Sequence, residues 1–190
     1  MSGDQGTNVP LPVKIVVAGG FGVGKTTLVG SISEIEPLRT EAAMTQQSVG
    51  VDVINTGTAK SATTVAMDFG RITLGNDDLV LYLFGTPGQA RFHFMWDELV
   101  KGAIGAVVLV DTSRLADSFA ALDFFEARGL PFVVAVNCFG GVVMHSVDDI
   151  RHALALPESV PLFLTDARVR AATRDALLTL VQHALSMARR

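Results

Sequence analysis

The sequence predicts one α/β domain in which a mostly parallel sheet has helices on both faces. Continuous apolar runs, such as residues 105–110 and 132–136, indicate strands that are buried on both faces. These runs alternate with segments of helical periodicity, as in parallel sheets whose strands are joined by crossover helices. The chain has 190 residues, of which 49% are hydrophobic and 18% charged. It is therefore long enough to bury a full core, and its pattern indicates a single domain.

The first predicted element is a buried strand. Residues 1–12 contain several glycines and prolines, and we expect them to form a flexible leader to one domain over residues 13–190. The apolar run 13–18 predicts the first strand, and residues 25–32 predict the first helix. Between them lies the glycine-rich segment 19–26, with the sequence GGFGVGKT.

This segment has the spacing G-x-x-x-x-G-K-T, which binds phosphate when it connects a strand to a helix. Backbone N–H groups and the positive helix N-terminus attract anions, Lys25 can reach the β- and γ-phosphates, and the Thr26 hydroxyl can ligate Mg²⁺. The alternative is a glycine turn with a solvated lysine, which the flanking strand and helix disfavour. The predicted nucleotide contacts in this segment are Gly19, Gly22, Val23, Gly24, Lys25, Thr26 and Thr27.

The middle of the chain predicts a long loop and a hairpin. Residues 34–62 are polar and have no sustained period, so we expect a loop with at most one short strand at 48–53. Loops of this length inside a domain are usually functional, and a disordered insertion is the alternative. Strands are predicted at 63–74 and 79–84, joined by the turn residues Gly-Asn-Asp-Asp at 75–78.

The second half of the chain alternates strands and helices. Two of its strands end in polar residues, Asp111 and Asn137, and ligands of such sheets bind beyond the carboxyl ends of the strands. Ser146 and Asp149 have the spacing of a capping box at a helix start. The predicted elements are, in order, a strand at 105–110, a helix at 117–128, a strand at 132–136, the helix begun by Ser146, a strand at 162–164 and a closing helix at 169–189.

Composition excludes several classes of function. The net charge of −4 gives no basic surface for nucleic acid or for an anionic membrane. The single Cys138 excludes an internal disulfide and fits a reducing compartment. No apolar run reaches the roughly 18 residues of a membrane span, and the first residues lack the pattern of a signal peptide. We therefore expect a cytoplasmic protein without direct membrane insertion, whose membrane association, if it has one, comes through a partner.

Two further segments carry a family resemblance. With Thr63–Gly70 (TTVAMDFG) and Gly85–Glu98 (GTPGQARFHFMWDE), the chain resembles the Ras-like small GTPases. It is more closely similar to the bacterial conservon GTPases, which are relatives of the gliding-motility polarity GTPases. The likeness extends from Val13 to the closing helix. It implies a Ras-like P-loop NTPase domain, with a mostly parallel six-stranded sheet that has one antiparallel strand, and a molecular switch that binds GTP or GDP with Mg²⁺ and hydrolyses GTP slowly.

The resemblance implies roles for residues near the γ-phosphate. Gly88 would donate its backbone N–H to the γ-phosphate, and Gln89 would orient the attacking water, with Lys25 as the other catalytic residue. Thr64 would close over Mg²⁺, and the loop 34–62 would be switch I. Gln89 as an exposed turn residue and Thr64 as an ordinary strand residue are the alternatives. Four other threonines are rivals of Thr64, namely Thr40, Thr45, Thr56 and Thr58.

The expected metal anchor departs from the family pattern. Ras-like proteins usually have an aspartate where this chain has Gly85, and glycine cannot anchor a cation. The nearest replacement is Asp68 on the neighbouring antiparallel strand, unless its side chain faces solvent. An acidic residue in an otherwise apolar strand costs free energy unless it is paired or near a cation. The predicted metal site therefore consists of Thr26, Thr64 and Asp68.

The base side departs from the pattern too. The segment Asn137–Gly140 (NCFG) keeps the asparagine of the guanine-recognition motif, but Gly140 stands in place of the aspartate that would accept hydrogen bonds from guanine. Losing that acceptor should cost a few kcal/mol of guanine preference. Asp166 and Ala167 resemble the last recognition loop, in which the Ala167 N–H would meet the base carbonyl. Base specificity therefore stays open.

The resemblance also implies protein partners. These are regulatory proteins, including a roadblock-type GTPase-activating partner and a sensor-kinase-like component. The apolar cluster that follows Gln89, residues 92–96, is expected to pack partly in the core and to present the rest as an effector surface. Two other functions compete with the switch. One is an interaction module with weak or absent nucleotide binding. The other is a P-loop kinase, which would need an arginine-rich lid, but the cluster Arg168, Arg170 and Arg174 fits the start of the closing helix better.

Overall fold

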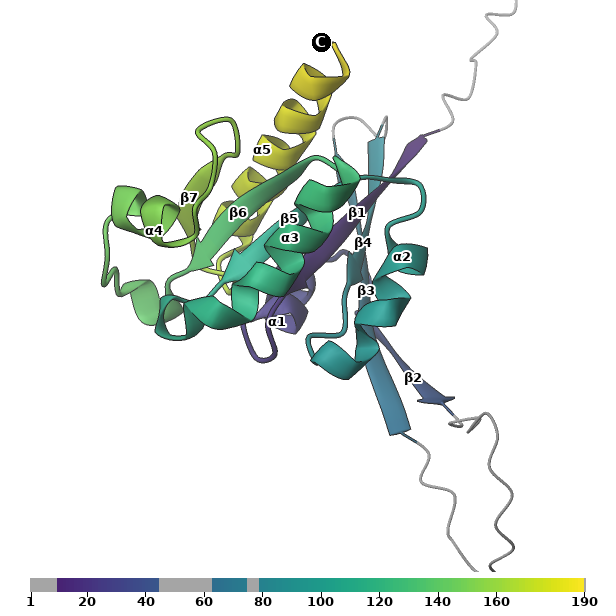
Figure 1. Ribbon diagram of the computed structural model, residues 1–190. Helices are drawn as coiled ribbons and strands as arrows, with labels where there is room; N and C mark the ends of the chain where they lie inside the picture. The colour runs from purple at the N-terminus through teal and green to yellow at the C-terminus, as the bar shows by residue number, and fades with distance from the viewer. Residues whose placement is uncertain (1–9, 45–62, 75–78, 190) are drawn as a thin grey trace, which may run out of the picture.

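The computed structural model describes residues 10–44, 63–74 and 79–189. In these ranges the chain forms one sheet in the order β2-β3-β4-β1-β5-β6-β7 (Figure 1). The strands are β1 Leu11–Gly19, β2 Leu38–Met44, β3 Thr63–Leu74, β4 Leu79–Gly85, β5 Ala103–Val110, β6 Phe132–Asn137 and β7 Leu162–Thr165. The α-helices are α1 Lys25–Ile32, α2 Trp96–Leu99, α3 Phe119–Arg128, α4 Val147–Ala153 and α5 Arg170–Ala188, and 3₁₀ turns cover Ala90–Met95, Thr112–Ser118 and Phe139–Gly141.

The sheet confirms the predicted α/β class. β1 pairs in parallel with β4 and β5, and β6 pairs in parallel with β5 and β7. β3 runs antiparallel to both of its neighbours and is the one antiparallel strand that the resemblance implied. The central strands β5 and β6 are buried along most of their length because helices cover both of their faces, as continuous apolar runs predict.

Strand β2 was not predicted, and with it the sheet of the described residues has seven strands, one more than the six that the resemblance implied. The sequence analysis placed its residues, Leu38–Met44, in the loop 34–62, but they pair with β3 from Leu38 opposite Phe69 to Met44 opposite Thr63. The segment LRTEAAM has no alternation of apolar and polar residues, so its strand conformation depends on the β3 ladder rather than on its own pattern. The rest of that loop, including the predicted strand 48–53, and the turn 75–78 lie outside the described residues.

The predicted leader is shorter than expected. Leu11 and Pro12, assigned to the leader 1–12, extend β1 and lie opposite Leu79 and Val80 of β4. Other boundaries agree closely with prediction, because the first helix begins at Lys25 and ends at Ile32, while the closing helix covers Arg170–Ala188. Residues 112–118, which overlap the start of the helix predicted at 117–128, form a 3₁₀ turn that Asp111 caps by accepting a hydrogen bond from the Ser113 N–H.

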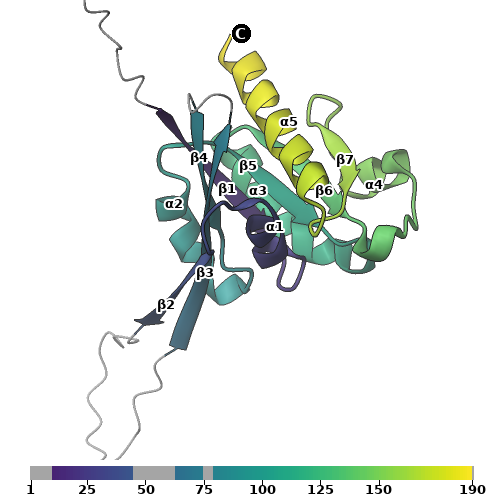
Figure 2. The ribbon, with the colours of Figure 1, turned by 180° about the vertical axis from the view of Figure 1, so that it is seen from behind.

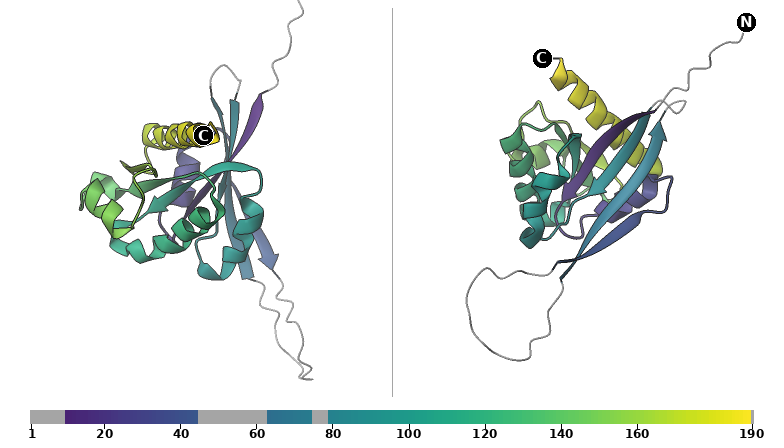
Figure 3. Two further views of the ribbon diagram at one scale, coloured as in Figure 1. Left: turned by 45° about the horizontal axis from the view of Figure 1, so that its top comes forward. Right: turned by 90° about the vertical axis from the view of Figure 1, so that its right-hand side faces the viewer.

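Two apolar layers enclose the sheet. α3 and α4 pack with Trp96 on one face, while α1 and α5 pack on the other. Figure 2 shows α1 and α5 from behind, and Figure 3 shows the sheet between the helix layers. Gly70 of β3 allows α1 to approach, since a Cβ there would lie 2.7 Å from Val29 Cγ1. No helix among the described residues is both long and apolar enough to cross a bilayer.

Helices α3 and α4 end in the same hydrogen-bonded turn with different residues at its left-handed position. In α3 that position is Gly129, with φ 60°, and in α4 it is Ala155, with φ 51°. The Leu130 N–H bonds to Phe125 O at 3.2 Å, and the Leu156 N–H bonds to Arg151 O at 3.1 Å. This turn usually contains glycine, because a Cβ is strained at positive φ.

We therefore expect Ala155→Gly to raise the free energy of unfolding by about 0.5 to 1 kcal/mol, since it removes strain from the folded state despite the greater freedom of glycine in the unfolded chain. Urea denaturation followed by circular dichroism measures the change. Gly129→Ala is the matched control and should lower stability by a similar amount. A destabilised Ala155→Gly protein would contradict the strain at this turn.

Candidate phosphate and nucleotide site

The glycine-rich loop lies at the carboxyl end of β1 and passes directly into α1. Gly24 is the residue before the helix, and its φ of 108° is one that side-chain-bearing residues rarely adopt. A Cβ on Gly24 would also lie 2.6 Å from Asn137 Nδ2. The loop is therefore fixed both by backbone conformation and by close contact with β6.

Lys25 fills the centre of this loop. Its Nζ donates hydrogen bonds to Gly19 O at 2.9 Å and to Gly20 O at 2.7 Å, and the residue is only 8% exposed. Burial lowers the pKa of Lys25 to about 8, although the negative charge of Asp68 opposes that shift. The loop thus holds a poorly solvated cation whose charge an anion can stabilise.

Asn137 connects the loop to the ends of β6 and β7. Its side chain is buried, with Nδ2 donating to Val23 O at 2.9 Å and Oδ1 accepting from the Ala167 N–H at 3.1 Å. The structure thus brings together Val23, Asn137 and Ala167, which the sequence assigned to one site. The Ala167 N–H, which the resemblance assigns to the base carbonyl, is donated to Asn137 here.

Asp68 points to the start of α1. The Thr26 hydroxyl donates a hydrogen bond of 2.6 Å to Asp68 Oδ2. The register that pairs Phe69 with Phe84 continues to Asp68 and Gly85, and a Cβ on Gly85 would lie 3.1 Å from Asp68 Cβ. The carboxylate therefore occupies the space above Gly85, and the alternative of a solvent-facing hairpin residue does not hold.

The segment 85–89 covers the loop from the other side. A Cβ on Gly88 would lie 2.6 Å from Lys25 Nζ and 2.9 Å from Gly20 O, so only glycine fits there. The Gln89 side chain accepts a hydrogen bond of 2.8 Å from Arg91 Nε. Gly88 therefore lies at the phosphate loop, while Arg91 holds the amide of Gln89.

Three residues of the site were not assigned by sequence. Trp96 is 2% exposed and donates its indole N–H to Pro87 O at 3.2 Å. Thr86 is buried, and its hydroxyl oxygen has no hydrogen-bond partner among the described residues. The Arg114 guanidinium lies 3.4 Å from the position of a Cβ on Gly22 and pairs with Asp111 at 3.5 Å. The signal that could have pointed to Trp96 is that a buried indole N–H needs a hydrogen-bond acceptor. The positions of Thr86 and Arg114 depend on tertiary packing.

The base side of the site is open. Gly140 is exposed with φ 72°, and a Cβ there would meet no heavy atom within 4 Å. Asp166 is held by Arg168, whose Nη2 lies 2.7 Å from Oδ2 and whose Nε lies 3.0 Å from Oδ1. The hydrogen bonds from Arg168 lower the pKa of Asp166 to about 2. The carboxylate that the sequence offered to the base is thus engaged by its neighbour.

Thr64 is placed only through its backbone. It lies in β3 opposite Ala43, and its side chain lies outside what the structure describes. The rival Thr40 lies in β2 opposite Met67, and Thr45 falls in the gap of the description, as do Thr56 and Thr58. The metal role assigned to Thr64 stays a prediction.

The residues that converge surround one cavity of about 390 Å³. Within the described ranges, no cluster of three or more His, Cys, Asp or Glu side chains could hold a metal. The Thr26 hydroxyl and the oxygens of a bound phosphate could hold a cation here, with Asp68 orienting that hydroxyl. The cavity is lined by Phe21, Gly22, Gly24, Lys25, Thr26, Thr27, Asp68, Thr86, Pro87 and Gly88.

Comparison with known proteins gives consistent matches. A family model described as "conserved hypothetical ATP binding protein" matches residues 17–187. An uncharacterized protein of Methanocaldococcus jannaschii is 32% identical over 127 residues, covering 66% of this chain and 69% of the relative. The human Ras-related protein Rab-7b is 28% identical over 125 residues, covering 66% of this chain and 53% of its own length. The chain thus spans about half of Rab-7b.

Solved structures match in fold. The G domain of the Thermotoga maritima FeoB iron transporter aligns with a TM-score of 0.62 at 17% identity, covering 92% of this chain and 99% of that domain. The cytosolic domain of the same transporter in apo form aligns with a TM-score of 0.63 at 17% identity, and the match covers 64% of its chain. At this identity the likeness shows the fold, which is that of a P-loop GTPase domain.

The lowered pKa of Lys25 makes stability depend on pH in a defined direction. In the unfolded chain the lysine keeps its proton up to about pH 10.5, whereas the folded protein releases it from about pH 8. Between these values the unfolded state binds more protons, so the free energy of unfolding contains a term that rises with pH, by up to about 3 kcal/mol. Urea denaturation across this range should show the free energy of unfolding of wild type rising, relative to that of Lys25→Met, by that amount.

The control for this experiment is Lys101→Met, which removes an exposed lysine of the same charge. Wild type and this variant should keep a nearly constant difference in stability over the same pH range. Parallel curves for wild type and Lys25→Met would show that the ammonium is not destabilised by burial.

Proposed function

We propose that this chain, which belongs to the family of conserved hypothetical ATP-binding proteins, is a nucleotide-dependent switch of the small-GTPase type. Such a switch binds a nucleoside triphosphate with Mg²⁺ and hydrolyses it slowly. The observation that carries the proposal is the convergence of Lys25, Asp68 and Gly88 on one cavity at the start of α1. We further propose membership of the conservon and gliding-motility group, on the resemblance of residues 63–70 and 85–98.

The side chains of the cavity suit the polyphosphate of a nucleotide. Lys25 already lies inside the loop, so it can neutralise phosphate charge without a large rearrangement. The Thr26 hydroxyl, held by Asp68, and in this proposal Thr64 as well, would hold a Mg²⁺ ion. When bound, that ion would supply further charge neutralisation of the phosphates.

The segment after Gly85 is proposed to sense the γ-phosphate. Gly88 lies close enough to Lys25 for its N–H to serve a phosphate bound beside the ammonium. For hydrolysis, Gln89 would exchange its hydrogen bond with Arg91 for one with the attacking water. Such an exchange would change the surface that partners read, where Phe94 is 60% exposed.

The proposed partners are those that the resemblance implies. They are a roadblock-type activating protein and a sensor-kinase-like component, which would also bring the switch to a membrane. An arginine supplied by an activating partner speeds hydrolysis in this class by roughly 10³ to 10⁵. Within the chain, Arg91 is engaged with Gln89 and with the Phe92 ring, which favours a contribution in trans.

A second candidate differs in the base, or in the strength of nucleotide binding. Gly140 supplies no acceptor for the guanine N–H groups, and Asp166 is held by Arg168. The name of the matching family points to ATP rather than GTP. These observations favour a switch with relaxed base preference, and in its extreme form an interaction module that binds nucleotide weakly.

Calorimetric titration of nucleotide-free protein with GDP, XDP and ADP, each with Mg²⁺, tests the proposal. We expect micromolar or tighter binding of GDP, since the phosphate contacts are preformed, and a loss of at least about tenfold in Lys25→Met. Similar affinity for all three nucleotides would select the relaxed-base candidate. If none of them binds measurably, the switch is excluded and the interaction module stands.

Asp68→Asn should reduce the dependence of nucleotide affinity on Mg²⁺. The amide keeps the shape of the side chain but removes the charge that orients the Thr26 hydroxyl, and loss of such a partner typically costs about 10-fold to 100-fold in metal affinity. Titrating Mg²⁺ against a fixed nucleotide concentration measures this effect. Glu34→Gln, which changes an exposed carboxylate that accepts from Thr73, is the control and should leave the titration unchanged. An unaltered Mg²⁺ titration in Asp68→Asn would reject the role given to Asp68.

A further inference from the structure

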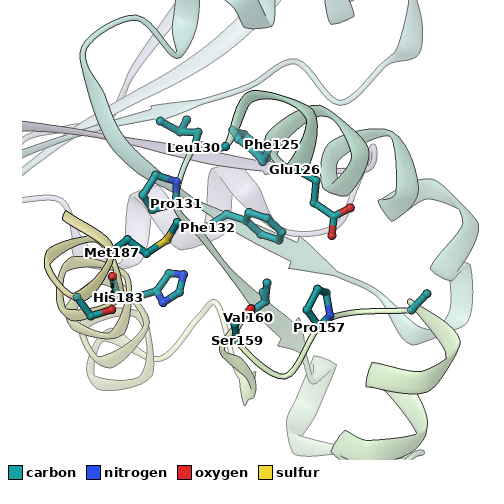
Figure 4. A pocket seen from close by; sticks show the side chains of 13 residues that line it. Phe125, Glu126, Leu130, Pro131, Phe132, Pro157, Ser159, Val160, His183 and Met187 are labelled. Atoms are coloured by element: carbon teal, nitrogen blue, oxygen red, sulfur yellow. Dashed lines mark hydrogen bonds between the residues drawn. The ribbon is translucent and has the colours of Figure 1, made fainter. Parts of the chain in front are cut away.

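A second cavity, of about 430 Å³, lies at the opposite end of the sheet from the phosphate loop. The residues that precede β6 and β7 line it, whereas the phosphate loop follows the carboxyl end of β1. Figure 4 shows its apolar floor, which Phe132 and Val160 form, with Met187 of α5 at one side. This volume suits a small organic molecule.

The charges around this cavity favour a cation. α3 ends at Arg128 and α5 at Ala188, so the negative carbonyl ends of two helix dipoles lie beside the cavity. Glu126 of α3 points its carboxylate into the space, opposite His183 of α5 (Figure 4). In the described part of the chain, no Lys or Arg forms an ion pair with Glu126.

Two arginines near this cavity, Arg128 and Arg151, are engaged elsewhere. Arg128 pairs with Asp97 and lies over the Phe124 ring. Arg151 donates to Pro157 O at 2.8 Å and to Val160 O at 3.0 Å, and it lies 3.9 Å from Glu158. The Glu126 charge therefore remains available to a bound cation.

An aromatic column connects the floor of this cavity to the phosphate side. The ring centroids of Phe132 and Phe125 are 6.1 Å apart, and those of Phe125 and Trp96 are 6.5 Å apart. Trp96 then donates to the carbonyl of Pro87, the residue before Gly88. All three rings are buried, at 5%, 0% and 2% exposure, and each is packed against the next in the column.

We propose that this cavity is a regulatory site for a small organic cation with an apolar body, and that the column Phe132, Phe125 and Trp96 transmits its occupancy to the segment 87–89. The apolar body would rest on the floor of the cavity, with its ammonium group at Glu126. The binding half of this proposal stands by itself. The regulatory half rests on the proposed nucleotide switch.

Three probes with the same phenylethyl body and different charge test the binding half. They are phenethylamine, 2-phenylethanol and 3-phenylpropionate, each titrated into the full chain without nucleotide and followed by NMR chemical shifts. Ligands of this size bind at millimolar concentration, so the titrations extend to about 20 mM. We expect phenethylamine to bind at least about fivefold more tightly than the other two, with shifts at residues lining the cavity.

Glu126→Gln should remove the preference for the amine, because it removes the charge and keeps the shape. Asp123→Asn, which changes an exposed acid on the same helix outside the cavity, is the matched control and should retain the preference. Equal affinity for the three probes, or no saturable shift at the cavity with any of them, would overturn the site.

Linkage tests the regulatory half. Saturating phenethylamine should change the nucleotide Kd by a factor of about 5 or more, and nucleotide should change the amine Kd by the same factor. Trp96→Phe keeps a ring but loses the N–H that reaches Pro87, so it should bind the amine and lose most of the coupling. Phe163→Leu, on the other face of the sheet, should keep the coupling.

The outcomes separate the two proposals. Amine binding that leaves the nucleotide Kd unchanged would overturn the regulatory half and retain the cavity as a binding site. A protein that bound the amine but no nucleotide would contradict the proposed switch and, with it, the regulation. Retained coupling in Trp96→Phe would reject the column as the route.

Discussion

The buried ammonium of Lys25 is the group around which this end of the molecule is built. Removing a charge from water is costly, so the loop must turn the Gly19 and Gly20 carbonyls toward Nζ, and it does so with glycines where side chains would be strained. Asn137 fixes the outer side of the same loop through Val23 O. The loop is thus packed closely around a cation, and a bound anion would balance the charge of that cation. Gly88 and the Asp68 carboxylate, which are other parts of the site, lie near this cation.

The two halves of the candidate site differ in how closely their residues are packed. At the phosphate end, the hydrogen bonds of Asn137 and Asp68 join elements far apart in sequence into one packed unit. At the base end, the chain after β6 contains two glycines with positive φ and exposed apolar side chains, with Val142 at 60% and Met144 at 72% exposure. Affinity at such a site comes mainly from phosphate contacts, while discrimination between bases depends on a segment that the fold holds with few contacts.

The sequence predicted those parts of the structure whose pattern is local. Buried parallel strands have long apolar runs, and the phosphate loop has a fixed spacing, so both were found, as was the position of Asp68 beside Gly85. Strand β2 was missed because its pairing partner, rather than its own residues, makes it a strand. The indole bond from Trp96 to Pro87 and the approach of Arg114 to Gly22 join segments that no short pattern relates. Thr64 shows the remaining limit, since the pairing of β3 places its backbone opposite Ala43 but does not place its side chain.

The position of the carboxylate on β3, beside Gly85 of β4, also has a consequence for how the sequence of such a site can vary. Because Asp68 fills the space beside Gly85, a chain with aspartate at both positions would place two carboxylates within contact, and a chain with neither would leave the Thr26 hydroxyl without its acceptor. A chain with aspartate at both positions, and a chain with aspartate at neither, should therefore bind the cation less well. In proteins with this arrangement, the glycine at position 85 and the aspartate at position 68 should therefore be inherited together as a pair.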